Sequence, residues 1–218
     1  MGESVAGEWV DVIESVDYNV ENLNTNASAI ILVGGLGERL QAVGLKPFLL
    51  CKGKSFLEIA VENVSSIQLN PVLIVTNHIF YGKIIAQNFP AKILINPHPE
   101  DGMLSSILIG LKEIESSIAG FFLCPIDYPL VEQATFHKLL LAHQSDPDKI
   151  ITPACNGQSG HPIVFPATLF QSLREAPQEL GARFVTRQFV HLTKTVEVND
   201  PGILININTP GLYCQYCK

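Results

Sequence analysis

A glycine-rich turn followed by two basic residues is the first stretch of the sequence that could do chemistry. Gly34, Gly35 and Gly37 come directly after an apolar run, and two basic residues, Arg39 and Lys46, follow. Glycines at such a turn let backbone N–H groups point at a polyphosphate, and basic side chains neutralise its charge. The same cations could stabilise a departing pyrophosphate. The spacing therefore predicts a site for a nucleoside triphosphate at this loop.

Two other phosphate-binding motifs begin in a similar way but match less of the sequence. A dinucleotide-binding turn, GxGxxG, needs its third glycine where Leu40 stands, and that glycine is the one that lets the helix pack close to the strand. A P-loop, GxxxxGKS or GxxxxGKT, ends like Gly53-Lys54-Ser55, but its leading glycine would fall on Phe48. The glycine turn with its two basic residues is therefore the better match.

An acidic residue at the end of an apolar run is the second feature with chemical meaning. Asp127 follows the run 121–126. Mg²⁺ prefers oxygen ligands, and nucleotidyl transfer uses such a cation to bridge phosphate oxygens. The alternative is an N-cap for a helix that begins near Glu132, but Tyr128 and Pro129 separate the two. We therefore predict that Asp127 binds Mg²⁺.

Short apolar runs alternate with amphipathic segments from Ser28 onward, and these elements must position the loop and the carboxylate. Apolar residues recur at helical spacing over 56–64 and 104–114. Alternating strands and helices imply right-handed crossovers, hence an α/β fold with three layers: a mostly parallel, Rossmann-like sheet with helices on both faces. Ligands bind such sheets beyond the carboxyl ends of the strands. The predicted strands are 29–33, 72–76, 92–95, 120–126, 149–152, 162–165, 194–198 and 203–207.

Composition and charge argue against several classes of protein. The chain has 218 residues, a formal net charge of −7 and a sequence pI near 5.3, whereas a general nucleic-acid binder carries a basic face. No apolar run approaches the roughly 20 residues that span a bilayer. Residues 1–26 contain no Lys or Arg, which a secretory signal would have. We therefore predict a cytoplasmic protein that binds neither nucleic acid nor membrane.

The chain divides into three predicted segments: an N-terminal extension over 1–27, one domain over 28–213, and a C-terminal tail over 214–218. The five cysteines are an odd number in a chain of medium size, so we expect reduced thiols. Cys214 and Cys217 form a CxxC in the tail, where a zinc site would need two more ligands. A frayed or dimer-packed terminus is the favoured reading of that motif.

The order of these motifs resembles the MobA-like nucleotidyltransferases, and among them the molybdenum-cofactor cytidylyltransferases. The glycine loop and Lys46-Pro47 are similar to the family pattern LxGGxGxR followed by KP. The resemblance extends from Ala29 to Tyr213. Further segments match in order: 52–57 is similar to GxPLL, 96–106 to NP…GMxxS, 125–131 to GDxPLV and 206–210 to DIDTP, while Gly160-His161-Pro162 and Gly181-Ala182-Arg183 match as they stand.

The resemblance implies a Mg²⁺-dependent enzyme that moves a nucleoside monophosphate from CTP or GTP to a phosphate acceptor such as molybdopterin, releasing pyrophosphate. It also implies a molybdoenzyme or its chaperone as a docking partner. Helix capping for Ser106, a core position for His161 and a surface salt bridge for Arg183 stay open as alternatives. The implied roles are catalytic for Arg39, Lys46 and Asp127, nucleotide-binding for Leu32, Gly34, Gly35, Gly37, Asn96 and Ser106, metal-binding for Asp127 and Asn208, and acceptor-binding for His161 and Arg183.

Several positions depart from the family pattern. Asn206 and Asn208 are amides where the family has aspartates, and Gly211-Leu212 replaces an acidic pair. The first loop reads LVGG, closer to the LAGG of GTP-using members than to the LAAG of CTP-using members, so the nucleobase stays open between the two. A sugar- or alditol-phosphate nucleotidylyltransferase and a degenerate, non-catalytic nucleotide-binding protein are the alternative functions.

Overall fold

The strands form a central sheet in a computed structural model that describes residues 25–35, 38–40 and 42–218. The sheet order is β10-β7-β9-β6-β1-β4-β5, with β8 paired to the end of β7. β1 runs parallel to both of its neighbours, and β9 runs antiparallel to β6 and β7. The strands are β1 Ala27–Leu32, β4 Val72–Thr76, β5 Lys92–Ile95, β6 Gly120–Pro125, β7 Ile150–Cys155, β8 Gln158–Ser159, β9 Ile163–Pro166 and β10 Thr193–Glu197.

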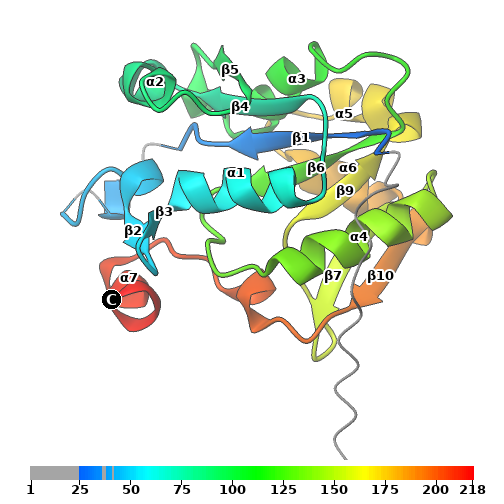
Figure 1. Ribbon diagram of the computed structural model, residues 1–218. Helices are drawn as coiled ribbons and strands as arrows, with labels where there is room; N and C mark the ends of the chain where they lie inside the picture. Colours follow the sequence, from blue (N-terminus) through cyan, green and yellow to red (C-terminus); the bar gives the residue numbers. More distant parts are fainter. Residues whose placement is uncertain (1–24, 36–37, 41) are drawn as a thin grey trace, which may run out of the picture.

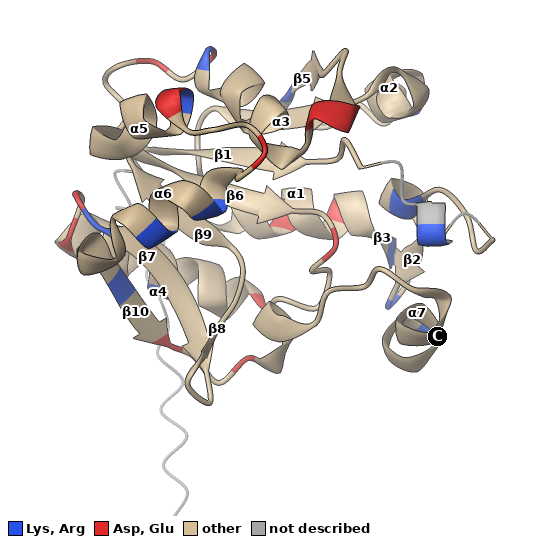
Figure 2. Ribbon diagram, turned by 180° about the vertical axis from the view of Figure 1, so that it is seen from behind, with Lys and Arg blue, Asp and Glu red and all other residues tan. Residues whose placement is uncertain are grey.

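Helices cover both faces of the sheet, and each face has its own hydrophobic core. Figure 1 shows α1 (Phe56–Ser66) and α4 (Gln133–Ser145) in front of the sheet, where they share a core with α2 (His78–Ile85) and α7 (Pro210–Cys217). Figure 2, from behind, shows α3 (Met103–Leu111), α5 (Phe170–Glu175) and α6 (Ala182–Gln188) over the other core. Strand β1 is buried along its whole length, as expected for a strand covered on both faces. The predicted three-layer fold is confirmed.

Polar side chains fix where the helices nearest the strand ends begin. Ser55 and Glu58 form a capping box at the start of α1. Asn77 caps α2 by accepting hydrogen bonds from the backbone N–H groups of the next turn, and Thr209 caps α7 in the same way. Of these caps, Asn77 directly follows β4 and so marks where the chain leaves the central sheet.

The predicted strand at 203–207 is wrong. The chain there forms the 3₁₀ helix η7, Pro201–Leu204, and then an extended stretch without sheet pairing. Asp200 explains the difference, because its side chain caps η7 at Gly202 N–H and also accepts hydrogen bonds from the Glu132 backbone and the Thr135 hydroxyl. The apolar residues join the hydrophobic core in front of the sheet, and η7 packs against β7 and β8 without strand pairing.

Short elements that the apolar pattern did not indicate surround the strand ends. Strands β2 (Leu50–Cys51) and β3 (Lys54–Ser55) form a small separate hairpin. The remaining elements are short 3₁₀ helices: η2 Glu38–Leu40, η3 Lys46–Phe48, η4 Pro99–Asp101, η5 Ala167–Leu169 and η6 Val190–Leu192.

The cysteines are not all reduced, contrary to the prediction. Cys51 of β2 and Cys217 of α7 form a disulfide, while Cys214 is free and exposed. The tail is helical and packed: the Tyr213 hydroxyl donates to the Leu50 carbonyl at 3.0 Å. No local pattern indicates this pairing, because the two cysteines are 166 positions apart. None of the helices in the described part of the chain is long and apolar enough to cross a bilayer.

Candidate active site

A cleft of about 240 Å³ opens at the carboxyl ends of β1 and β6. These strands are parallel neighbours with Leu32 opposite Pro125, so the residues that follow them meet at one edge of the sheet. Predicted residues from both motifs therefore line the same space. The lining includes Leu32, Gly34, Gly35, Lys46, Met103, Ser106 and Asp127.

Lys46 and Asp127 form an ion pair at this edge, with the ammonium nitrogen 3.3 Å from one carboxylate oxygen. Their side chains are only 11% and 18% exposed. Lys46 begins η3, which is held in place by the buried Pro47 and by an edge-on contact between Phe48 and Phe80 of α2. The two predicted charges are thus brought together from segments that lie 81 positions apart.

The loop between η7 and α7 brings one amide to each partner of the Lys46–Asp127 ion pair. Asn206 donates from Nδ2 to Asp127 Oδ2 at 2.9 Å, and the Asn208 amide oxygen accepts a short hydrogen bond from the Lys46 ammonium. Between them, Ile207 is fully buried and its N–H donates to the Asp127 carbonyl at 2.8 Å. Alternation along this extended stretch places both amides on the cleft side while the isoleucine anchors the loop in the core.

Two oxygens of this group are buried without a hydrogen-bond partner, Asp127 Oδ1 and Asn206 Oδ1. Leaving a buried acceptor unpaired costs about 1–3 kcal/mol, so such atoms mark places where a ligand is expected. One carboxylate and two amide oxygens are a donor set that suits Mg²⁺ or Mn²⁺. The residues present therefore fit a divalent cation.

The electrostatics of Lys46 reflect its burial. Desolvation lowers the pKa of the Lys46 ammonium, the Asp127 carboxylate partly offsets this, and the charge of Arg39 lowers the pKa further. Arg39 lies in η2 and is exposed; it is not among the residues that line the cleft, but it is close enough for its charge to act on Lys46. Gly37, predicted to bind nucleotide, lies outside the described residues.

The opposite wall of the cleft is held by Asn77, a residue that the sequence analysis did not single out. Its Nδ2 donates to the Gly34 carbonyl at 3.1 Å, and its Oδ1 accepts from the backbone N–H groups of Ile79 and Phe80. One side chain therefore caps α2 and fixes the glycine loop. An asparagine directly after an apolar strand and before a helical segment was the available signal.

Asn96 lies behind the cleft wall and reaches the cleft through Ser106. It is 1% exposed, and its Nδ2 donates to the hydroxyls of Ser105 at 2.8 Å and Ser106 at 2.9 Å. Its Oδ1 accepts from the His98 backbone N–H. Because Ser106 Oγ accepts this bond, its own O–H is left to donate into the cleft.

Gly34 and Ser106 face each other across the cleft. A Cβ atom built on Gly34 would lie 3.3 Å from Ser106 Oγ, tighter than an ordinary contact. The absence of a side chain at position 34 therefore leaves room beside the hydroxyl. This is the place where the size of a bound group would be sensed.

A second cavity, of about 220 Å³, adjoins the first and contains both predicted acceptor residues, His161 and Arg183. Met103 lines both cavities. Arg183 belongs to α6, whose basic ribbon segments are visible in Figure 2. The remaining lining is mostly apolar, so this cavity suits a ligand with an apolar body and a negative charge.

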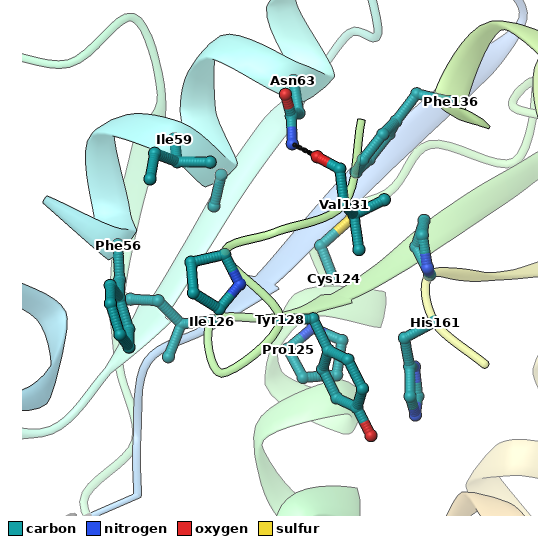
Figure 3. A pocket seen from close by; sticks show the side chains of 13 residues that line it. Phe56, Ile59, Asn63, Cys124, Pro125, Ile126, Tyr128, Val131, Phe136 and His161 are labelled. Atoms are coloured by element: carbon teal, nitrogen blue, oxygen red, sulfur yellow. Dashed lines mark hydrogen bonds between the residues drawn. The ribbon is translucent and has the colours of Figure 1, made fainter. Parts of the chain in front are cut away.

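His161 lies between this cavity and the loop that carries Asp127. Its ring is 4.8 Å from the ring of Tyr128, and Figure 3 shows the two side by side. His161 Nδ1 is buried without a partner. Burial lowers the pKa of His161, which the Asp127 carboxylate partly offsets and the Arg183 charge reinforces. The ring is therefore biased towards its neutral form.

Gly160 explains how His161 reaches that position. A Cβ atom on Gly160 would lie 2.2 Å from the Ile203 carbonyl oxygen, so only glycine fits there. The His161 N–H donates to the same carbonyl at 3.1 Å. This close approach joins the start of β9 to η7, the element that precedes Asn206.

The cavity in Figure 3 has a supporting role. It holds about 20 Å³, roughly one water molecule, and its walls are mainly apolar. Asn63 of α1 donates to the Val131 carbonyl at 3.1 Å across it. The loop after Asp127 is therefore fastened to α1, which holds the carboxylate in place.

Comparisons with known proteins agree with this geometry. The sequence profile described as the MobA-like NTP transferase domain matches residues 29–195. The chain belongs to the MobA-like NTP transferase family. A search of curated proteins by sequence finds no match. The matched range includes the glycine loop, Lys46, Asp127 and Arg183, but ends before Asn206 and Asn208.

Solved structures share the fold of this family member at low sequence identity. Rv0371c from Mycobacterium tuberculosis has a TM-score of 0.75 at 16% identity, covering 88% of this chain and 97% of its own. A nucleotidyl transferase from Methanothermobacter has a TM-score of 0.72 at 19% identity, covering 88% and 95%. The molybdopterin-guanine dinucleotide biosynthesis protein A of Archaeoglobus fulgidus has a TM-score of 0.64 at 17% identity, covering 87% and 96%. These likenesses confirm the nucleotidyltransferase fold.

Proposed function

We propose that this protein transfers a nucleoside monophosphate from CTP or GTP to a phosphorylated acceptor, with molybdopterin as the first candidate, and releases pyrophosphate. The observation that carries the proposal is the Lys46–Asp127 pair, which lies in one cleft with Gly34, Gly35 and Ser106. A metal–nucleotide complex needs a carboxylate for its cation and a positive charge with an accessible backbone for its phosphates. Asp127 supplies the first, and Lys46 with the glycine turn supplies the second.

The reaction needs positioning and charge rather than a covalent intermediate. An oxygen of the acceptor phosphate attacks the α-phosphorus in line, and the bond from that phosphorus to the oxygen bridging to the β-phosphorus breaks. Pyrophosphate leaves with the electron pair of that bond. Gly34 and Gly35 present backbone to the triphosphate, Arg39 and Lys46 stabilise the leaving charge, and the Ser106 hydroxyl donates to the base or ribose.

A divalent cation would be held by Asp127 and Asn208, with the unpaired Asn206 oxygen close by. Such a cation supplies charge neutralisation at the phosphate oxygens. A crystal structure of Rv0371c is described as a complex with manganese, which supports a cation in this family of folds. Two amides and one carboxylate bind a divalent cation more weakly than carboxylates alone. We therefore expect the site to fill only at a high metal concentration.

The acceptor would occupy the cavity with His161 and Arg183. Its apolar lining suits a flat heterocyclic body, and Arg183 suits a phosphate. The Archaeoglobus neighbour is described as a molybdopterin-guanine dinucleotide biosynthesis protein, which supports molybdopterin as the acceptor. A product as reactive as a nucleotide-linked molybdenum cofactor would then pass to a molybdoenzyme or its chaperone.

The space beside Ser106 limits the size of the nucleobase that can bind. Because Gly34 has no side chain, it leaves room for guanine. The structure of CMP:2-keto-3-deoxy-manno-octonic acid synthetase, described as complexed with CTP, supports cytosine as the other candidate base.

We propose a cytoplasmic location, which is reducing and suits a pterin acceptor. The Cys51–Cys217 disulfide, by contrast, favours an oxidising compartment.

A non-catalytic, nucleotide-binding role is the second candidate. The observation that favours it is the amide pair Asn206 and Asn208, which lowers the negative charge available to a catalytic cation. In that case nucleotide would bind without turnover.

The test is pyrophosphate release from CTP and GTP in the presence of Mg²⁺, measured with molybdopterin, a sugar phosphate or an alditol phosphate as acceptor. Release with molybdopterin supports the proposal. Release only with a sugar or alditol phosphate assigns the enzyme to that class instead. Nucleotide binding by calorimetry without release from any mixture assigns the non-catalytic role.

A further inference from the structure

One ammonium group occupies the gap between two of the residues assigned to the cation. Lys46 Nζ donates to Asp127 Oδ2 and to Asn208 Oδ1, and the lysine side chain is only 11% exposed. Those two oxygens belong to the donor set assigned to the divalent cation, together with the unpaired Asp127 Oδ1 and Asn206 Oδ1. The ammonium and the cation therefore compete for the same donors.

In the absence of nucleotide, the charge balance favours the Lys46 ammonium over the divalent cation. Asp127 is the only acidic residue among the described residues that line the cleft. With Lys46 beside it the pair is neutral, and a divalent cation added there would leave an excess of two positive charges in a partly buried site. Burying uncompensated charge is costly, so the cation alone is expected to bind weakly.

A triphosphate changes this balance. It brings about four negative charges, and Lys46 lines the same cleft as the glycine loop that would receive them. The four-carbon side chain of lysine turns easily, and its ammonium binds phosphate as a point charge. Once Lys46 has moved to the phosphates, Asn208 Oδ1 is free, and Asp127 Oδ2 keeps only its hydrogen bond from Asn206.

We propose that the Lys46 ammonium occupies the cation site in the free protein and moves to the triphosphate when a nucleotide binds. Metal binding and nucleotide binding are therefore coupled through this side chain. The inference rests on the proposed function, since it concerns the same cleft. By linkage, nucleotide raises the metal affinity by the same factor as metal raises the nucleotide affinity.

Asn206 is the positioning residue that makes the exchange possible. Its bond to Asp127 Oδ2 and the bond from the Ile207 N–H to the Asp127 carbonyl do not involve Lys46. Asp127 therefore stays in place when the lysine leaves. An amide suits this role because its N–H donates to the carboxylate, whereas an aspartate at 206 would repel it.

The experiment is a Mn²⁺ titration of the full chain, followed by electron paramagnetic resonance, with and without an α,β-methylene analogue of CTP or GTP. We expect the analogue to tighten Mn²⁺ binding by about tenfold or more, within the usual range of coupling between sites. In Lys46→Met, Mn²⁺ should bind more tightly than in the wild type without nucleotide, and the coupling should fall below about threefold. Lys54→Met, which changes an exposed lysine paired with Glu62, should behave as the wild type.

Asn206→Ala supplies an independent measurement. It should weaken Mn²⁺ binding in the presence of the analogue while leaving metal-free analogue binding unchanged, a split that a general loss of structure would not produce. Equal Mn²⁺ affinity with and without bound analogue in the wild type would overturn the inference and leave the proposed function standing. Failure of both analogues to bind, with or without Mn²⁺, would overturn the proposed function and the inference together.

Discussion

The two walls of the cleft differ in how completely their polar groups are paired. On the wall of the glycine loop, Asn77 and Asn96 each use both the oxygen and the nitrogen of the amide. On the opposite side, Asp127 Oδ1 and the nearby Asn206 Oδ1 are buried without a partner. One wall is complete without a ligand, and the other is not.

This difference assigns different tasks to the two walls: one fixes the shape of the cleft, and the other binds the charged groups. Paired, buried amides fix the backbone and hydroxyls that a nucleotide would meet, so that wall is preorganised. Unpaired oxygens and a charged lysine on the other wall leave free energy to be gained when a cation and phosphates bind. Substitutions should therefore reduce turnover on the open wall, and stability or selectivity on the paired wall.

The largest effect is expected for Asp127→Asn. The substitution keeps the shape and removes the only acidic side chain among the described residues that line the cleft, so kcat should fall by about 10³-fold or more. The melting temperature should also fall, because the buried Lys46 ammonium loses its counter-charge. Asp146→Asn, at an exposed ion pair with Lys194, is the matched control. Retained turnover in Asp127→Asn would show that catalysis does not depend on the wall that carries Asp127.

Breaking the disulfide tests how the open wall is held. Cys51→Ser should lower the free energy of unfolding by about 2–4 kcal/mol, because the link closes a long loop of the unfolded chain. Since α7 follows Asn208 directly, KM for the nucleotide should rise as well. Denaturant titration and steady-state kinetics check both effects. Cys214→Ser removes an exposed free thiol and should change neither.

Asn96→Ala tests the paired wall. The buried Ser106 hydroxyl and the half-buried Ser105 hydroxyl lose their donor, so the free energy of unfolding should fall by about 1–3 kcal/mol. Metal affinity should stay as in the wild type, because Asn96 does not touch the Asp127 side. Asn199→Ala, on the surface, should shift stability by less than about 0.5 kcal/mol. A large change in metal affinity with unchanged stability would reverse the distinction between the walls.

The smallest effect is expected for Gly34→Ala. The added methyl would lie 3.3 Å from Ser106 Oγ, so the hydroxyl must give way by a few tenths of an ångström and the methyl takes up space beside the expected base. We expect the ratio of kcat/KM for CTP over GTP to rise by about tenfold, the scale of one methyl group in a pocket. Gly35→Ala, where a Cβ meets nothing within 4 Å, is the control. An unchanged ratio would place the base elsewhere.

Much of the fold was predictable because its signals are local. The apolar runs of β1 and β6 and the helical spacing of α1 and α3 are properties of adjacent residues. The family assignment rests on motifs in order, and it is confirmed. The strand predicted at 203–207 was wrong because an apolar stretch does not reveal whether it is buried by pairing or by packing. The roles of the site residues stay predictions.

By itself the sequence determined which residues carry charge and at which strand ends they stand: a glycine turn after β1, a carboxylate after β6, and two amides near the end of the chain. Only the tertiary structure decided that Lys46, Asp127, Asn206 and Asn208 meet, and that Cys51 bonds to Cys217. The physical reason is distance along the chain. Contacts between residues 79 or more positions apart depend on strand order and packing, which no local pattern encodes.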